Sequence, residues 1–257
     1  MITAASNSRM KRLVQLQGQA KYRRSEGVFL VEGVRMFLEA PPEKIREVYV
    51  TESFLRWKAC RQKLEQTGYE VVADHLFSKI TDTRTPQGIL CVMEQFSWDL
   101  EDYLNREDGL FLLLEDIQDP GNLGTMLRTA EGAGVTAVLM SRTTADIYNP
   151  KAIRSTMGSV YRVPFFYVAD METAFGLLRK KGVKIYAAHL AGEHVYTQEN
   201  YGSKAAFVIG NEGNGLREET AAAADCLVRI PMEGQVESLN AAIAAALFLY
   251  EAKRQRQ

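Results

Sequence analysis

Short segments that are wholly or almost wholly apolar, in the second half of the chain, constrain its fold more than any other feature. Each is four or five residues long, and together they cover residues 110–114, 137–140, 183–187, 206–209 and 226–230. A strand that is apolar on both faces is typical of a parallel sheet covered by helices on both sides. Segments with helical spacing follow several of these runs, at residues 123–133, 172–181 and 239–254. The pattern predicts an α/β domain with a parallel sheet.

The first half repeats this alternation on a smaller scale. Strand-like runs occupy residues 28–31, 48–51, 69–72 and 90–93, and helical runs occupy residues 8–18, 34–39 and 54–66. Ser8 is the expected N-cap of the first helix and Gly18 its expected end, and a turn is expected at residues 23–27. A stretch rich in Asp, Glu and Asn joins the halves. The predicted division is therefore a first domain at residues 1–97, a linker at 98–108 and a second domain at 109–257.

The composition excludes several classes of protein. With 46% hydrophobic and 25% charged residues and no long apolar run, the chain is neither disordered nor membrane-spanning. Residues 1–12 lack the apolar stretch of a secretory signal, so the cytoplasm is the expected compartment. The odd number of cysteines, without a CxxC pair, argues against a disulfide framework and a zinc site, and the histidines show no metal spacing. These residues are Cys60, Cys91, Cys226, His75, His189 and His194.

Charge is uneven along the chain, although the net charge is only −1. Residues 1–35 contain seven basic and two acidic residues, a local net charge of +5. A basic stretch of this kind suits a polyanion such as RNA. A solvated helix face has the same pattern, so charge alone leaves both interpretations open.

Three polar, glycine-containing segments follow predicted strands, at the edge where open α/β sheets bind ligands. The first, residues 119–130 (DPGNLGTMLRTA), carries an apolar helix face, and Arg128 lies off that face. Asn122 and Arg128 are its candidate functional residues. Taken alone, the segment is better explained by Asn122 as a helix cap and Arg128 as a surface residue.

The second segment, residues 207–216 (FVIGNEGNGL), runs from a strand into a glycine-containing loop. Glycines allow backbone N–H groups to approach a ligand closely. The order GxxGxG is neither the dinucleotide fingerprint nor a phosphate-binding GxxxxGK[ST], which argues against a Rossmann cofactor or a nucleoside triphosphate. A simple strand-to-helix turn with Glu212 in solvent is the alternative interpretation.

The third segment, residues 230–240 (IPMEGQVESLN), precedes a long alanine-rich helix. Ser238 and Asn240 are expected at its first turn, with Ser238 as the N-cap. The exposed N–H groups and the positive end of such a helix can hold an anionic or polar group. The capping and the binding interpretation are compatible.

In this order, the three segments resemble motifs one, two and three of the SpoU (TrmH-like) branch of the SPOUT superfamily of RNA methyltransferases. Residues 146–158 (DIYNPKAIRSTMG) also resemble that family's pattern. The first half, in which residues 29–33 (FLVEG) lead into a helix, resembles the L30e-like substrate-binding domain that precedes the catalytic domain in many members.

The resemblance implies a SPOUT domain with a deep trefoil knot, a homodimer, and S-adenosylmethionine bound by the knotted loops, without a metal. Topology rules alone would argue against a knot. By matching position, the resemblance implies cofactor contacts at Gly210, Ile230 and Leu239. It implies an active site formed by Asn122, Arg128, Glu212, Ser238 and Asn240.

The implied reaction is an in-line attack of a ribose 2′-hydroxyl on the sulfonium methyl group, which needs alignment and the removal of one proton. A charged guanidinium has no acceptor, so Arg128 is expected to hold a neighbouring phosphate and steer the hydroxyl. Ser238 and Asn240 are expected to orient the ribose or the cofactor carboxylate, and Glu212 to fix its loop. Dependence on the 2′-hydroxyl predicts that RNA is a substrate and DNA is not.

Ribosomal RNA is the expected substrate, because family members with an L30e-like first domain commonly act on it. Three alternatives remain at this point: a transfer RNA 2′-O-methyltransferase, a methyltransferase acting on a base or a small molecule, and a non-catalytic RNA-binding member. The intact Asn122, Arg128, Ser238 and Asn240 argue against the last of these.

Overall fold

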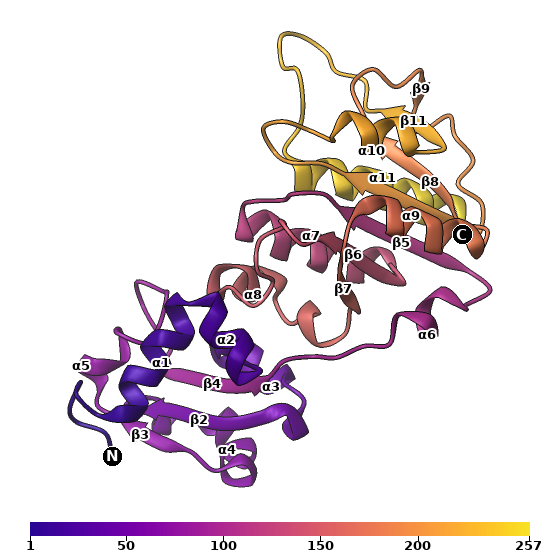
Figure 1. The fold of residues 1–257 in the computed structure, drawn as a ribbon. Helices are drawn as coiled ribbons and strands as arrows, with labels where there is room; N and C mark the ends of the chain where they lie inside the picture. Colours follow the sequence, from indigo (N-terminus) through magenta and orange to yellow (C-terminus); the bar gives the residue numbers. More distant parts are fainter. The chain divides into compact units, whose positions relative to one another are not determined.

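The computed structural model describes residues 1–257, except for the side chain of Lys58, and it divides into two compact units (Figure 1). The first unit consists of Met1–Ser97 with Asp146–Tyr161, and the second of Trp98–Ala145 with Arg162–Gln257. Residues 146–161 thus group with the first unit, whereas the division made from the sequence had assigned them to the second domain. Helix α8 (Pro150–Thr156) lies in this segment and packs against a strand of the first unit.

The first unit is built on a four-stranded sheet with the order β1-β4-β2-β3. Strand β4 is antiparallel to both neighbours, and β2 pairs with β3 in parallel. The strands are β1 (Val28–Glu32), β2 (Ile45–Thr51), β3 (Glu70–Val72) and β4 (Ile89–Glu94). The α-helices besides α8 are α1 (Ser8–Gly18), α2 (Ala20–Glu26), α3 (Val34–Glu39), α4 (Arg61–Thr67) and α5 (Asp74–Phe77). All four predicted strands and the helices at 8–18 and 34–39 are present.

Three local predictions for this unit were wrong. The N-cap of α1 is Asn7, whose side chain accepts a hydrogen bond from the backbone N–H of Arg9, and not Ser8. The helix expected at 54–66 is interrupted, because Phe54–Arg56 and Lys58–Cys60 form 3-10 turns before α4 begins. Residues 20–26 form α2 where a turn was expected at 23–27, and the chain leaves this helix through Gly27 in the left-handed conformation.

Helix α2 was missed because residues 23–27 were expected to form a turn. Arg23 is instead 2% exposed, and its guanidinium donates to the carbonyl oxygens of Leu16 and Gln17 and to the carboxylate of Asp146, at 2.6 Å for the shortest contact. A buried charge is tolerated when it is paired and its donors are satisfied, as they are here.

Most of the basic N-terminal stretch is neutralised within the first unit. Four of its seven basic residues form ion pairs: Arg9 with Glu70, Arg12 with Glu26 and Glu47, Arg23 with Asp146, and Arg35 with Glu39. Lys11, Lys21 and Arg24 form no ion pair with any described side chain. The local charge of +5 is therefore not a single open cationic face, and only part of it is available to a polyanion.

The second unit is built on a seven-stranded sheet with the order β7-β6-β5-β10-β8-β11-β9. Every pair in it is parallel, which confirms the predicted sheet. The strands are β5 (Gly109–Leu114), β6 (Ala137–Ser141), β7 (Phe165–Val168), β8 (Lys184–Ala188), β9 (His194–Val195), β10 (Lys204–Ile209) and β11 (Cys226–Arg229). The helices are α6 (Leu100–Leu104), α7 (Pro120–Ala133), α9 (Met171–Lys180), α10 (Glu218–Ala223) and α11 (Ala241–Gln255).

Helices cover both faces of this sheet. Ala206 and Val208 of β10 belong to the core that contains the buried face of α9, whereas Phe207 between them stacks on Phe248 of α11, with ring centroids 5.5 Å apart. Successive side chains of a strand point to opposite faces, so α9 and α11 lie on opposite sides. Helix α7 packs against α11 (Figure 1). None of the described helices combines the length and apolar character that crossing a membrane requires.

The strand order brings three distant segments of the second unit to one edge. Strand β10 pairs with β5 on one side and β8 on the other, and β11 pairs with β8. Because parallel strands end at the same edge, the segments that follow β5, β10 and β11 emerge next to one another. These are the three motifs singled out in the sequence.

Candidate active site

A cavity of about 320 Å³ lies at the carboxyl edge of the second unit's sheet. The ends of three strands, the loops that follow them and part of α11 line it. These are residues 188–190 at β8, 209–216 at β10, and 228–230, 232 and 237–239 at β11. The three residues predicted to contact a cofactor, Gly210, Ile230 and Leu239, all line this cavity. Its size is that of a small-molecule site.

Position 210 requires glycine, because the backbone of Gly215 and Leu216 passes very close to it. A Cβ atom at this position would lie 2.3 Å from the carbonyl carbon of Gly215 and 2.4 Å from the nitrogen of Leu216. The loop closes through two backbone hydrogen bonds between Asn211 and Gly215, at 3.0 and 2.9 Å. Non-bonded atoms cannot approach to 2.3 Å, so no other residue fits at position 210 unless the loop moves.

A chain of hydrogen bonds joins the three motifs. The side-chain amide of Asn240 donates to Oδ1 of Asn122 at 3.0 Å, and the amide of Asn122 donates to Oε1 of Glu212 at 3.0 Å. Glu212 also accepts from the backbone N–H groups of Gln118 at 3.0 Å and Asp119 at 3.1 Å. The structure thus brings together three of the five predicted active-site residues, which lie up to 118 positions apart in the sequence.

Glu212 is ionised in this arrangement. Partial burial opposes its charge, but the hydrogen bonds from Asn122 and from the backbone of Gln118 and Asp119 outweigh burial and lower the pKa of the carboxyl group. The carboxylate therefore acts as an acceptor that holds the 210–216 loop against the start of α7. The loop is indeed a strand-to-helix turn and Glu212 is exposed, but its carboxylate is hydrogen-bonded to the first motif.

The helix caps differ from the expected ones. Asp119 caps α7 by accepting from the backbone N–H of Asn122 at 2.9 Å, so the Asn122 side chain is free to bind Glu212. Asn240 caps α11 by accepting from the backbone N–H of Ala242 at 2.9 Å, and Ser238 is not the cap. In both cases the helix begins at a residue different from the one predicted.

The other two predicted residues, Arg128 and Ser238, are exposed. Ser238 lines the cavity, whereas Arg128 projects from α7 away from its buried face. Neither makes a hydrogen bond or ion pair with any described side chain. Both are thus available for a ligand.

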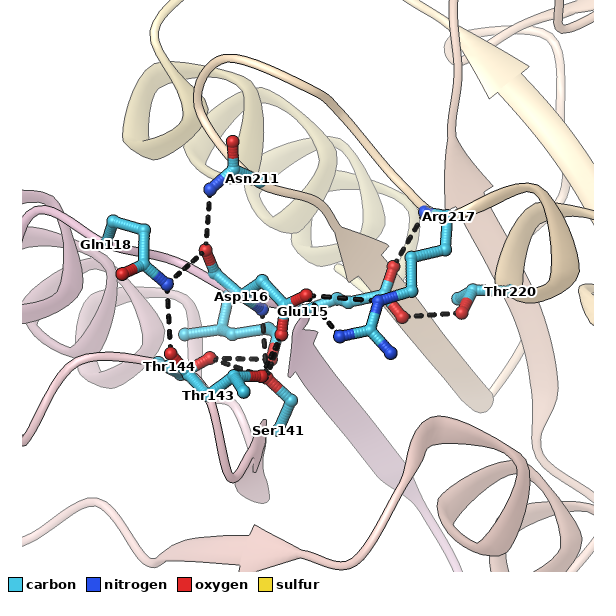
Figure 2. Close-up of polar contacts among 10 residues, drawn as sticks. Glu115, Asp116, Gln118, Ser141, Thr143, Thr144, Asn211, Arg217 and Thr220 are labelled. Carbon is cyan, nitrogen blue, oxygen red and sulfur yellow. Dashed lines mark hydrogen bonds and ion pairs between the residues drawn. The ribbon is translucent and has the colours of Figure 1, made fainter.

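Two further carboxylates, which the sequence did not reveal as functional, hold the segment that follows the 210–216 loop (Figure 2). Glu115 and Asp116 directly follow β5. Glu115 is 2% exposed and accepts from the backbone N–H of Arg217 at 2.9 Å and from the hydroxyl of Thr220. Asp116 pairs with the guanidinium of Arg217 at 2.5 Å. Consecutive acidic residues at the end of a buried strand were a visible signal, because an unpaired carboxylate would not be stable there.

Asp116 contacts the 210–216 loop and the segment that follows β5 through its backbone as well as its side chain. Its φ is 56°, which is uncommon for a residue other than glycine. This conformation lets its carbonyl oxygen accept from the side-chain amides of Asn211 at 2.8 Å and Gln118 at 3.1 Å. Ser141 donates to the carboxylate at 2.8 Å and accepts from the Asp116 N–H at 2.9 Å (Figure 2). The local strain is thus balanced by several contacts.

Replacing Asp116 by alanine is expected to weaken cofactor binding about tenfold, because losing the pair with Arg217 releases the 210–217 loop at a cost of roughly 1–3 kcal/mol. Burial opposes ionisation of Asp116, but hydrogen bonds from Thr143, Arg217 and Ser141 lower the pKa of its carboxyl group. A lowered pKa contributes stability at neutral pH that is lost as the pH falls through the folded-state value. The difference in the free energy of unfolding between wild type and Asp116→Ala should therefore become smaller as the pH falls.

Asp225 provides a matched control for this prediction. It likewise pairs with an arginine, Arg179, at 2.8 Å and accepts from a backbone N–H, that of Ile185, at 2.8 Å, but it does not line the cavity. Calorimetric titration with the cofactor should give an unchanged dissociation constant for Asp225→Ala. Equal weakening in both variants would mean that Asp116 acts only on global stability.

Comparison with known proteins identifies the family. The model of the SpoU rRNA Methylase family matches residues 109–250. The chain belongs to this family. The model of the MRM3-like substrate binding domain matches residues 7–91. The family resemblance inferred from the three motifs is thereby confirmed.

Several relatives of this SpoU family member extend over almost its whole length. It is 34% identical over 253 residues to the Bacillus subtilis 23S rRNA (guanosine(2553)-2′-O)-methyltransferase RlmP, covering 97% of each chain. It is 37% identical to the Bordetella pertussis 23S rRNA (guanosine-2′-O-)-methyltransferase RlmB, covering 86% of this chain and 93% of the relative.

Some solved structures match the whole chain, whereas others match only part of it. The AdoMet-bound rRNA methyltransferase from Sinorhizobium meliloti superimposes with a TM-score of 0.88 at 31% identity and covers 100% of this chain and 98% of that one. The TrmH/SpoU tRNA modifying enzyme from A. aeolicus covers only 61% of this SpoU family member and 80% of its own chain, with a TM-score of 0.52 at 27% identity.

Proposed function

We propose that this chain transfers a methyl group from S-adenosylmethionine to a ribose 2′-hydroxyl of ribosomal RNA. The observation that carries this proposal is the extent of the similarity. Relatives named as 23S rRNA 2′-O-methyltransferases align with both units, whereas the similarity to a tRNA modifying enzyme covers 61% of the chain. Ribosomal RNA is therefore favoured over transfer RNA.

The residues around the cavity suit S-adenosylmethionine. The cavity of about 320 Å³ is large enough for a molecule of this size, and Gly210 allows the 210–216 loop that lines it to close tightly. Gly210, Ile230 and Leu239 would hold the cofactor. When bound, S-adenosylmethionine supplies a methyl group that is already activated on a sulfonium.

The predicted active-site side chains would have two roles, which are positioning the loops and contacting the substrate or cofactor. The chain of hydrogen bonds from Asn240 through Asn122 to Glu212 keeps the starts of α11 and α7 and the 210–216 loop in fixed positions. Preorganisation of this kind lets the enzyme align the two reactants before reaction. Arg128 would bind the phosphate beside the target ribose and steer its hydroxyl, and Ser238 would orient the ribose or the cofactor carboxylate.

The finer features of the fold implied by the family belong to this proposal. A trefoil knot is supported by the position of the 230–240 segment, which lines the cavity together with two other loops before α11 returns to pack on β10 and α7. An L30e-like first unit is supported by its four-stranded sheet flanked by helices and by the substrate-binding domain model at residues 7–91.

A homodimer is proposed to form through α7 and α11. A groove of about 730 Å³ lies along these helices, and its lining includes Ile243 and Tyr250, which are 53% and 50% exposed. Exposed apolar side chains gathered in one groove are typical of protein interfaces. A second copy of this chain is the partner that the family resemblance implies.

Ile243→Asp is expected to convert the dimer to a monomer, because it places a charge in an apolar interface. Sedimentation equilibrium should show a dissociation constant at least about 100-fold higher than that of wild type, the effect of roughly 3 kcal/mol. Val14→Asp, at an exposed apolar position of α1, is the matched control and should leave the dimer intact. A monomeric wild-type protein would exclude the proposal.

The function is tested by transfer of labelled methyl from S-adenosylmethionine to RNA from a strain that lacks the protein. Nuclease digestion and mass spectrometry should place the methyl on one ribose of ribosomal RNA, and the mass of the nucleoside fragment separates ribose from base. A DNA version of the same sequence should accept none. Methyl groups on transfer RNA alone would favour the alternative substrate, and cofactor binding without any transfer would favour a non-catalytic RNA-binding protein.

A further inference from the structure

Three potential metal ligands meet at the far edge of the second unit's sheet, outside the cavity. They are His194 in β9, Glu199 in the following loop and Cys226 at the start of β11. Their ligand atoms all lie within 4.8 Å of one another, and Nδ1 of His194 is 2.8 Å from Oε1 of Glu199. None of these residues lines the cofactor cavity.

Strand pairing creates this cluster, which explains why the sequence showed no metal spacing. Strands β9 and β11 are parallel neighbours, and His194 is in register with Val228. This register places Cys226, two residues earlier on the same strand, near the beginning of β9. Glu199 returns to the same place through the loop after β9.

We propose that His194, Glu199 and Cys226 form a binding site for a borderline-soft divalent cation such as Zn²⁺. One imidazole nitrogen, one carboxylate oxygen and one thiolate sulfur are ligands that Zn²⁺ takes in proteins, and the thiolate disfavours hard cations such as Mg²⁺. Three protein ligands leave a fourth position of a tetrahedral site for water. Nδ1 of His194 and Oε1 of Glu199 already lie 2.8 Å apart, so two of the ligands are close together.

The surroundings allow both entry and retention of an ion. His194 has a side chain 56% exposed, whereas that of Glu199 is only 13% exposed, so the cluster opens to solvent on one side and is anchored on the other. Lys184 is the opposing charge, with Nζ 3.7 Å from Oε2 of Glu199. That carboxylate has two oxygens, so one can bind the cation while the other faces the lysine.

The site would clamp the edge of the sheet near the cofactor loops. Strand β11 begins at Cys226, and its end, Val228 and Arg229, lines the cavity. Strand β9 is only two residues long and pairs with β11 alone among the described strands. A cation bridging the two strands would replace hydrogen bonds that so short a strand cannot supply, and it requires no role in methyl transfer.

The test is titration of the purified full-length protein with Co²⁺, which reports its ligands by absorption. Thiolate coordination should give a sulfur-to-cobalt charge-transfer band in the near ultraviolet that saturates at one ion per chain, and Zn²⁺ but not Mg²⁺ should remove it. His194→Ala alters an exposed side chain and should raise the Co²⁺ dissociation constant by at least about tenfold, the smallest effect usual for disturbing a metal site.

Cys226→Ser should abolish the charge-transfer band, and His75→Ala, an exposed histidine of the first unit, should leave it unchanged. Circular dichroism of each variant checks that it is folded, and His194→Ala keeps the test decisive if Cys226→Ser does not fold. No charge-transfer band in wild type, or the same band and affinity in His194→Ala, would overturn the proposal. Either result is independent of methyl transfer, which is measured without added metal.

Discussion

Gly210→Val is expected to weaken cofactor binding about 100-fold while leaving the rest of the second unit folded. Even the first carbon of the new side chain would lie 2.3 Å from Gly215, so the 210–216 loop must open and its two closing hydrogen bonds must break. Overpacking of this severity costs about 3 kcal/mol, which corresponds to a dissociation constant for S-adenosylmethionine about 100-fold higher. Isothermal titration calorimetry measures the change directly.

The same loop offers a matched control for that experiment. A Cβ atom at Gly213 would meet only Oδ1 of Asn211, at 3.6 Å, which is an ordinary van der Waals contact. Gly213→Ala should therefore bind the cofactor nearly as wild type does. If Gly210→Val and Gly213→Ala bound equally well, the close approach at position 210 would have no part in forming the cofactor site.

Arg128→Ala should lose methyl transfer by about 1,000-fold, within the range usual for removing a group that acts on the reacting hydroxyl. Cofactor affinity should not change, because Arg128 does not line the cavity. Its side chain is exposed and makes no contact with a described side chain that the substitution would break, so the melting temperature should also stay constant. Single-turnover kinetics with unmethylated ribosomal RNA measure the rate of methyl transfer. Calorimetry measures the cofactor affinity and the melting temperature.

Two further variants decide how Arg128 acts. Arg142→Ala removes another exposed arginine of the second unit, and it should keep full activity if the effect is specific to the site. Arg128→Lys keeps the charge but not the planar fork that binds a phosphate at two points. A lysine variant with most of the wild-type rate would contradict a specific role of the guanidinium, whether in positioning or in proton transfer.

Local pattern was sufficient for most of the secondary structure and for the parallel sheet. Residues 110–114, for example, are apolar at every position. This pattern is typical of a strand that is covered on both faces, so it predicts a buried parallel strand well. Helix ends were less certain. At Asn240 and Asp119 the cap is decided by which side chain reaches the first free N–H groups, a matter of one or two residues that several neighbouring polar side chains can satisfy.

The motifs also indicated the candidate site residues, but not how these residues contact one another. Glu212 looked like a solvated turn residue, and its contacts to Asn122 and to the backbone after β5 exist only because β10 pairs with β5. Glu115 and Asp116 were overlooked for the same reason, since their partner Arg217 is about a hundred positions away.

Sequence by itself determined the family, the strand-rich α/β class and the identity of the polar residues, because these depend on side-chain type and short-range spacing. Tertiary structure alone decided which of those residues meet. Tertiary packing joins Asn122, Glu212 and Asn240 in one hydrogen-bonded chain, buries Arg23 against Asp146 and brings His194 to Cys226. Such contacts depend on long-range strand pairing, and no local pattern encodes which strand will lie beside which.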